Sequence, residues 1–118
     1  MAIKIRKFKP ADQKQIYALV TSILKNEFGL DEKTYPETDL NHIGTSYGGA
    51  RDIFLVALQE KTVVGTIAVK EDDKNTALLR RIAVSPELRG IGLGKQLIVK
   101  AIESVSYTHL TLPTTPYV

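Results

Sequence analysis

Three glycines, at positions 90, 92 and 94, separate an apolar strand pattern from an amphipathic helix pattern. The strand pattern covers residues 77–84 and is stopped by Ser85-Pro86. The helix pattern follows at once, with apolar residues at helical spacing at Leu93, Leu97, Ile98, Ala101, Ile102 and Val105. A strand, a glycine-rich turn and a helix in this order present free backbone N–H groups at the positive end of the helix dipole, which predicts a binding site for an anion.

A glycine cluster alone fits an ordinary tight turn flanked by the surface cations Arg89 and Lys95 equally well, so the spacing has to decide. A dinucleotide-binding fingerprint G-x-G-x-x-G starting at Gly90 would need a glycine where Lys95 stands. A Walker loop would need four residues between its glycines and a Ser or Thr after the lysine, whereas Gln96 follows Lys95. The pattern that remains is Arg/Gln-x-x-Gly-x-Gly/Ala, which Arg89, Gly92 and Gly94 satisfy.

The rest of the chain reads as further strands and helices from its periodicity and its turn residues. In the first half we expect a strand over residues 3–8, a helix from Pro10 to a C-cap at Gly29, and a polar loop over residues 30–50 with one short helix near 39–47. In the second half we expect a hairpin of strands over residues 53–58 and 63–69, a turn at 71–75, the strand over 77–84 and the final helix. One domain is expected, because 118 residues suit a single hydrophobic core.

Composition excludes several classes of function. The chain lacks cysteine and has two widely separated histidines, so we expect no disulfide, no thiolate chemistry and no metal site. The net charge of +3 comes from basic residues scattered among acidic ones, which argues against nucleic acid as a partner. No apolar run approaches the about 20 residues of a membrane helix and no secretory signal begins the chain, so we expect no membrane partner and a cytoplasmic location.

The residues around the glycines resemble the GNAT superfamily of acetyl-CoA-dependent N-acetyltransferases. The stretch from Leu79 to Lys95 is similar to that family's fourth strand, pyrophosphate loop and following helix. Phe54-Leu55-Val56-Ala57 and Val63-Val64-Gly65 are similar to its central hairpin, and the order of elements agrees from Ile3 to about Ser104. The resemblance implies an α/β fold of the α+β mixed-sheet kind, in the order β-α-α-β-β-β-α, with the last strands of the family missing.

The resemblance also implies the chemistry. Acetyl-CoA is the expected co-substrate, and its acetyl group passes to a primary amine by direct attack in a ternary complex, on a small molecule, an amino acid, a peptide or a protein N-terminus. The fourth strand of the family splays from its neighbour at a bulge, and Ile82 and Val84 occupy the positions whose backbone holds the pantetheine arm. The residues that the resemblance assigns to the coenzyme are Ile82, Ala83, Val84, Arg89, Gly90, Ile91, Gly92, Leu93, Gly94 and Lys95.

The acceptor side is less well defined by the sequence. Polar and aromatic residues of the 30–50 loop are the candidate substrate residues, namely Tyr35, Asp39, His42 and Tyr47. Glu27, Asp39 and His42 are the candidates for a catalytic group, although residues in such places are more often surface or capping residues. Arg80 and Arg81 could meet an acidic substrate, although cations on a sheet face are more often solvated or paired.

The sequence departs from the family in two places. Leu78 stands where many relatives carry a glutamate that acts as general base, so no base is assigned. The family's later strands, with a tyrosine that usually serves as the acid, have no counterpart, and neither Tyr107 nor Tyr117 lies in a matching context. These departures keep open a non-catalytic acyl-CoA-binding module or an inactive fragment as the alternative to an enzyme. A homodimer is also left open.

The segment from Val105 to Val118 breaks the helical periodicity and contains no pattern of a strand that would complete the sheet. Its Val-Ser-Tyr-Thr-His-Leu resembles a translated sequencing adapter, so we expect an incomplete domain over residues 1–104 and a non-native or disordered tail over 105–118. A natural short variant with a threonine- and proline-rich disordered end is the alternative.

Overall fold

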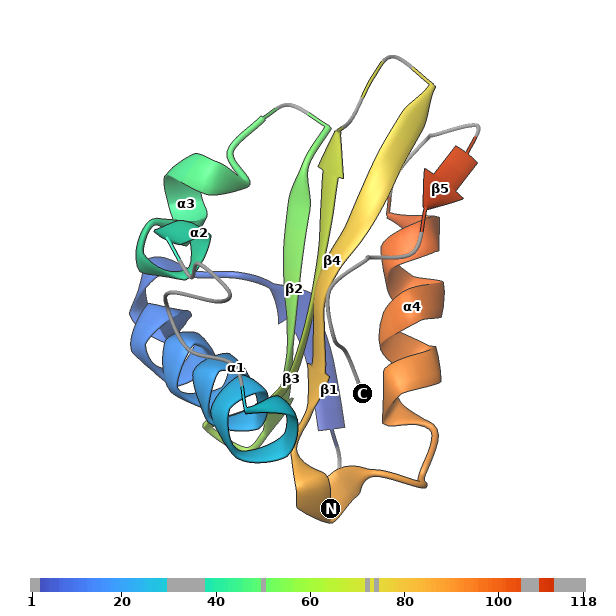
Figure 1. Ribbon diagram of the computed structural model, residues 1–118. Coiled ribbons are helices and arrows are strands. Elements are labelled where there is room, and N and C mark those ends of the chain that lie inside the picture. The colour runs from blue at the N-terminus through green and yellow to red at the C-terminus, as the bar shows by residue number, and fades with distance from the viewer. Residues whose placement is uncertain are drawn as a thin grey trace.

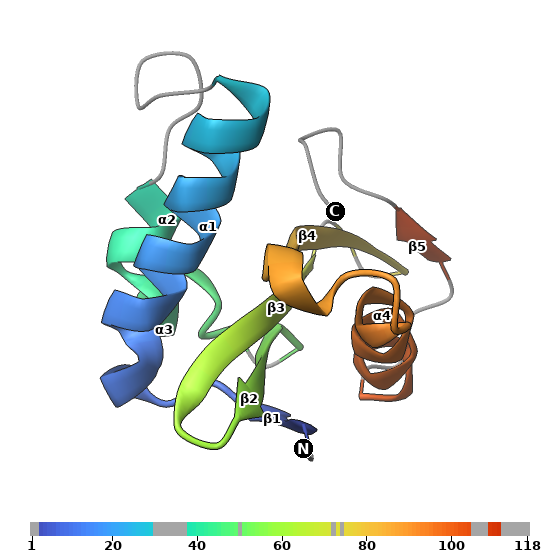
Figure 2. The ribbon, with the colours of Figure 1, turned by 90° about the horizontal axis from the view of Figure 1, so that it is seen from below.

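A five-stranded sheet with strand order β1-β2-β3-β4-β5 forms the centre of the protein. The computed structural model describes residues 3–29, 38–49, 51–71, 73, 75–104 and 109–111. The helices over residues 13–28, 38–41 and 43–46 cover one face of the sheet, and the helix over residues 93–103 covers the other (Figures 1 and 2). The elements are β1 (Ile3–Lys7), α1 (Gln13–Phe28), α2 (Thr38–Asn41), α3 (Ile43–Ser46), β2 (Ile53–Gln59), β3 (Thr62–Glu71), β4 (Thr76–Val84), α4 (Leu93–Glu103) and β5 (His109–Thr111).

The mixed α+β fold and the order of its elements are confirmed up to the end of α4. β1 to β4 form antiparallel pairs, and β2 and β3 are the predicted hairpin. Gly29 ends α1 in the left-handed conformation with φ 66°, as expected of a glycine C-cap. The single short helix expected near residues 39–47 is two short helices instead, because His42 leaves helical geometry with φ −141° between α2 and α3.

The sheet has an apolar core on each face. Ile16 and Val20 of α1 pack with Phe54 and Val56 of the hairpin on one side. The core on the other side is formed by α4, whose Leu97 is fully buried against β3. A methyl group added at Gly65 of β3 would lie 3.0 Å from Leu97 Cδ1, so the glycine allows α4 to approach the sheet closely.

A β-bulge interrupts β4. Thr66 of β3 pairs with Ala83 and Ala68 pairs with Arg80, so two residues of β4 lie opposite one residue of β3. Ala77 and Leu79 before the bulge pack in the same α4-side core as Ile82 and Val84 after it. The apolar alternation therefore skips one position, and this places Arg80 and Arg81 together on the opposite face, beside α2 and α3.

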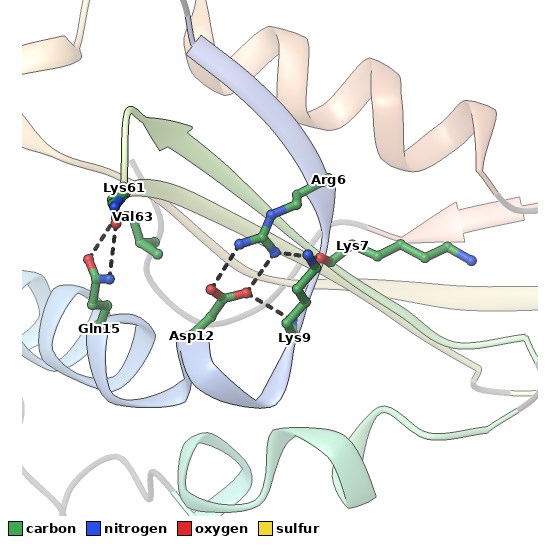
Figure 3. A network of polar contacts seen from close by, with 7 residues as sticks. All are labelled: Arg6, Lys7, Lys9, Asp12, Gln15, Lys61 and Val63. Carbon is green, nitrogen blue, oxygen red and sulfur yellow. Dashed lines mark hydrogen bonds and ion pairs between the residues drawn. The ribbon is translucent and has the colours of Figure 1, made fainter.

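The first turn of α1 is fixed to the sheet by side chains (Figure 3). Asp12 is buried, and its carboxylate accepts hydrogen bonds from Arg6 Nη1 and Nη2 at 2.8 and 3.0 Å and from the backbone N–H of Lys9 at 2.8 Å. Gln15 contacts the hairpin, since its Oε1 accepts from the N–H of Val63 at 2.9 Å and its Nε2 donates to the carbonyl of Lys61 at 3.2 Å. These contacts set the position of α1 against β1 and the β2–β3 turn.

The tail corrects one prediction. We expected no strand after residue 105, yet residues 109–111 form β5, which pairs in parallel with Thr76–Leu78 of β4. The outer edge of β4 offers unpaired backbone groups, and α4 returns the chain to the start of that strand, as a crossover between parallel strands requires. The non-native origin of the tail stays a prediction. Within the described ranges, no helix is long and apolar enough to cross a membrane.

Candidate functional site

The predicted anion site is a hollow of about 380 Å³ where β4 ends and α4 begins. β4 enters a 3₁₀ turn, Pro86–Leu88, which is followed by the glycine-rich turn and by α4. The hollow is lined by Val84, Leu88, Arg89, Gly90, Gly92, Leu93 and Gly94. The structure therefore brings together six of the ten residues that the resemblance assigned to the coenzyme.

The backbone of this turn is arranged to receive an anion. Among the described residues, no backbone N–H from Gly90 to Lys95 donates to a protein acceptor, and the first bond of α4 is from Gln96 N to Gly92 O at 3.0 Å. Gly92 is the N-cap of α4 with φ 84°, and no side chain caps the helix there. A Cβ at Gly90 or Gly92 would meet no atom within 4 Å, so the space beside both residues is open. The exposed N–H groups and the helix dipole together favour a bound phosphate.

Arg89 lines the hollow and is paired with a partner that the sequence did not predict. Its Nη1 and Nη2 donate to the two carboxylate oxygens of Glu27 at 2.5 and 2.7 Å, and its Nε donates to the carbonyl of Val84 at 3.1 Å. The bonds from Arg89 lower the pKa of the Glu27 carboxyl. Glu27 is thus an ion-pair partner that joins the end of α1 to the turn, and a lowered pKa makes it a poor general base.

Four assigned residues lie outside the hollow's lining. Ile82 and Ala83 are buried in the cores on opposite faces of the sheet, so only their backbone is available to a ligand. The side chain of Ile91 is 59% exposed. Lys95 lines a separate groove between α4 and β1. Among the described residues, β5 covers the outer edge of β4 only as far as Leu78, which leaves that edge free at Ile82.

A second hollow, of about 530 Å³, lies between α2, α3 and the sheet. It is lined by Asp39, His42, Thr45, Ser46, Lys70 and Arg80. Asp39 and His42 were predicted substrate residues. Tyr35, also predicted, lies outside the described residues. Thr45, Ser46 and Lys70 were missed, because nothing in their sequence context marks them; only the fold brings α3 and β3 together.

Asp39, which lines the second hollow, belongs to an ion pair that spans 42 positions in the chain. Arg81 is buried and donates from Nε and Nη2 to the carboxylate of Asp39 at 2.9 and 2.5 Å. Tyr47 donates its hydroxyl to Asp39 Oδ2 at 2.7 Å. Burial would raise the pKa of Asp39, but the hydrogen bonds from Arg81 and Tyr47 outweigh it and lower the pKa. Burial and the bond to Asp39 raise the pKa of the Tyr47 hydroxyl above its usual value.

The bulge at Arg81 is fixed by the same contacts. Arg81 has φ 52°, in the left-handed region that costs a non-glycine residue about 1–3 kcal/mol. Its guanidinium is held by Asp39, and its carbonyl accepts a bond of 2.7 Å from the hydroxyl of the fully buried Thr66. Arg81 is thus paired and not solvated, in agreement with the second half of the expectation that a cation on a sheet face is solvated or paired, and its left-handed backbone turns its side chain toward α2.

Leu78 stands at the position where many members of the family carry a glutamate that acts as general base. It pairs with Lys70 of β3 and with Thr111 of β5, and by alternation it lies on the same face of the sheet as Arg80. A leucine accepts no proton, so the absence of an assigned base stands. Within the described part of the chain, no three His, Asp or Glu side chains gather in a way that could hold a metal ion.

The chain belongs to the acetyltransferase (GNAT) family, whose model matches residues 17–109. A search of curated proteins found no match. Among solved structures, the chain is similar to a GNAT-family acetyltransferase of Staphylococcus aureus Mu50, with 29% identity, 87% of this chain covered, 65% of the other and a TM-score of 0.78. An acetyltransferase of Streptococcus agalactiae 2603 is similar with 27% identity, coverage of 86% and 65%, and a TM-score of 0.78.

The PaiA N-acetyltransferase of Thermoplasma acidophilum, solved in complex with coenzyme A, is similar with 29% identity, coverage of 87% of this chain and 71% of the other, and a TM-score of 0.67. The chain spans 65% of the length of the Staphylococcus and Streptococcus proteins.

Proposed function

We propose that this chain binds acetyl-CoA at the start of α4 and serves the transfer of the acetyl group to a primary amine. The observation that carries the proposal is the run of backbone N–H groups from Gly90 to Lys95 that have no acceptor among the described residues and border an open hollow. Family membership supports the same assignment. When bound, acetyl-CoA would supply an activated thioester and a pyrophosphate that matches these donors.

The contribution of this chain is mainly to bind and to orient. The N–H groups at the start of α4 and the helix dipole would hold the pyrophosphate, while Arg89, which lines the hollow, is already paired with Glu27. The backbone of Ile82 and Val84, beside the bulge, would position the pantetheine arm along the free edge of β4. A preformed edge of this kind costs little reorganisation when the thioester carbonyl is polarised.

The acceptor amine must be neutral when it attacks, so its proton has to leave to a base or through water. Asp39 is unsuited to that task, because its carboxylate is engaged by Arg81 and Tyr47 and its pKa is lowered. We propose that Asp39 shapes the acceptor hollow and that the base lies elsewhere. A cytoplasmic location and a homodimer stay predictions.

One observation favours the alternative of a non-catalytic acyl-CoA-binding module. Leu78 leaves the fourth strand without a proton acceptor at the family's usual position. Such a module would bind acetyl-CoA as the enzyme does but would not consume it. Binding and turnover therefore have to be measured separately.

The experiment that tests the proposal has two parts. Calorimetry of the purified chain with acetyl-CoA, with backbone amide NMR shifts as the local readout, should show binding with the largest shifts from Gly90 to Lys95. Release of free thiol in the presence of a panel of primary amines then separates the enzyme from the binding module. Binding with shifts confined to another part of the chain would overturn the assignment of the turn.

A further inference from the structure

We propose that the second hollow binds an acidic group of the acceptor, such as a carboxylate or phosphate, and that Arg80 is the residue that recognises it. This inference rests on the proposed function, since it names the class of amine that the acetyl group would reach. It assigns to Arg80 a specificity role that the family resemblance does not supply.

The charges around the hollow are the first argument. The Asp39 carboxylate is engaged by Arg81 and Tyr47. Lys70 is engaged as well, since its Nζ donates to the carbonyl of Ser46 at 2.6 Å and to Asp52 Oδ2 at 3.1 Å. Among the described residues, Arg80 has no hydrogen-bond or ion-pair partner, although it is half-buried and lines the hollow. Arg80 lowers the pKa of Asp39 through its charge alone, so among the described residues its guanidinium N–H groups are not taken up by a protein acceptor.

The bulge supplies the second argument. It places Arg80 and Arg81 next to each other on the same face of the sheet, where an ordinary strand would send them to opposite faces. Adjacent like charges repel, and the single negative charge of Asp39 is shared between them, with direct bonds from Arg81 and a longer-range interaction with Arg80. An anion in the hollow would relieve the remaining repulsion and would meet a planar guanidinium that can donate two parallel hydrogen bonds to a carboxylate or phosphate.

The position of Arg80 along β4 is the third argument. Arg80 lies two residues before Ile82, whose backbone is proposed to orient the thioester, and strand residues advance by about 3.3 Å each. An acidic group held by Arg80 would therefore lie close to the reacting centre. Its neighbours Thr45, Ser46 and His42 offer hydroxyl and imidazole groups that can complete the coordination of an anion. A small amine that carries an acidic group fits this hollow better than a neutral or polycationic amine.

The test uses three amines of similar size that differ in one group: O-phosphoethanolamine, β-alanine and ethanolamine. Each is titrated into the purified chain without coenzyme, with the backbone amides of β4 and α3 and the Nε–H of arginine followed by NMR. The two acidic amines should bind with a Kd about tenfold lower than that of ethanolamine, because a charge-assisted pair replaces a neutral contact. Their shifts should centre on Arg80.

Variants decide whether Arg80 is responsible. Arg80→Gln should reduce the preference for the acidic amines to about twofold or less, whereas Arg80→Lys should retain part of it because the charge remains. Lys4→Gln removes the same charge from an exposed position on β1, outside the hollow, and should leave the preference intact. Circular dichroism confirms that each variant is folded.

Three results would overturn the proposal: equal binding of all three amines, an unchanged preference in folded Arg80→Gln, or no saturable binding of any of them. These results are independent of the proposed function, because acetyl-CoA binding is measured at the start of α4. Loss of acetyl-CoA binding at that turn would reject the proposed function while leaving the anion preference measurable.

Discussion

The first turns of α1 and α4 both lie against the sheet, yet the residue at each N-cap is different. The N-cap of α1 is Asp12, whose buried carboxylate accepts from Arg6 and from the N–H of Lys9 in the turn before the helix, although it makes no side-chain bond to α1 itself. α4 follows a left-handed Gly92, has no acidic residue in its first turn and receives no side-chain cap. The carboxylate at the start of α1 is part of the chain, whereas an anion at the start of α4 would have to come from outside.

The two helix starts differ in whether the chain itself supplies a carboxylate there, as it does at α1, or does not, as at α4. Both starts use the same physical rule, that exposed N–H groups and the helix dipole favour negative charge. Where the sequence supplies the negative charge, the result is stability. Where glycines replace it and leave open space, we propose that an anion from outside the chain binds. Each of the following changes alters one side of this contrast.

The largest effect is expected from Gly92→Asp, which places a carboxylate and a Cβ where the pyrophosphate must approach. Acetyl-CoA binding should weaken by about 100-fold or more, ~2.7 kcal/mol, because the new carboxylate repels the pyrophosphate and occupies the space beside the backbone N–H donors. Calorimetry gives the Kd, and circular dichroism confirms folding.

Gly29→Asp is the matched control for that variant. Gly29 also has positive φ, at 66°, and a Cβ there would also meet nothing within 4 Å, so the backbone cost and the change in charge are the same. Its acetyl-CoA affinity should stay within about twofold of the parent. If folded Gly92→Asp binds as tightly as Gly29→Asp, the turn is not the coenzyme site.

The second effect is expected on the α1 side, from Asp12→Asn. An amide cannot pair with Arg6 as a carboxylate does, so the free energy of unfolding should fall by about 1–2 kcal/mol while acetyl-CoA affinity is unchanged. Urea unfolding measures the first quantity and calorimetry the second. Glu60→Gln, which removes an exposed carboxylate from the hairpin turn, should change neither.

The loss should also depend on pH in a defined direction. The hydrogen bonds from Arg6 lower the pKa of Asp12 below its usual value of 3.8, so the folded state holds the charged form more firmly than the unfolded state does. The stabilisation is complete above that usual value and is lost as the pH falls through the lowered pKa. The difference between parent and Asp12→Asn should therefore shrink in acid, and a difference that grows in acid would contradict this assignment.

The smallest effect is expected from Arg89→Ala. Its guanidinium is already engaged by Glu27 and by the carbonyl of Val84, and the pair is partly exposed. Acetyl-CoA affinity should fall by only about 2- to 5-fold, since the backbone donors remain. Glu27→Gln frees the guanidinium without removing it and should leave the affinity equal to that of the parent or raise it. A loss as large as that of Gly92→Asp would show that the cation, and not the backbone, holds the pyrophosphate.

The sequence predicted those parts of the fold that depend on local pattern. The hairpin, the Gly29 cap and the strand–turn–helix around Gly92 follow from periodicity and from glycine positions, because those signals act over a few residues. The pairs Asp39–Arg81 and Glu27–Arg89 join residues 42 and 62 positions apart, and no local pattern encodes such partners. Their carboxylates were accordingly read as capping, surface or catalytic groups.

The bulge lies between these cases. The apolar residues Ala77 and Leu79 have odd numbers, whereas Ile82 and Val84 have even numbers. The shift was therefore visible in the sequence as two arginines between two alternating apolar pairs. The family resemblance implied a bulge in this strand, but the apolar pattern alone predicted one uninterrupted strand over residues 77–84, because a near-continuous apolar run does not show which residues share a face. β5 was missed for a different reason, since its pairing depends on the free edge of β4 and not on a strong pattern of its own.

The bulge also determines how this gene can change. Any substitution at position 80 leaves the count of residues in β4 intact, but deletion of one arginine codon would restore simple alternation. Ala77, Leu79, Ile82 and Val84 would all still face α4, so the core would keep its pattern, while the bulge and one of the two arginines beside α2 and α3 would be lost. The core therefore tolerates loss of one residue at this point of the strand, and the change falls on the bulge and on the face that carries the arginines.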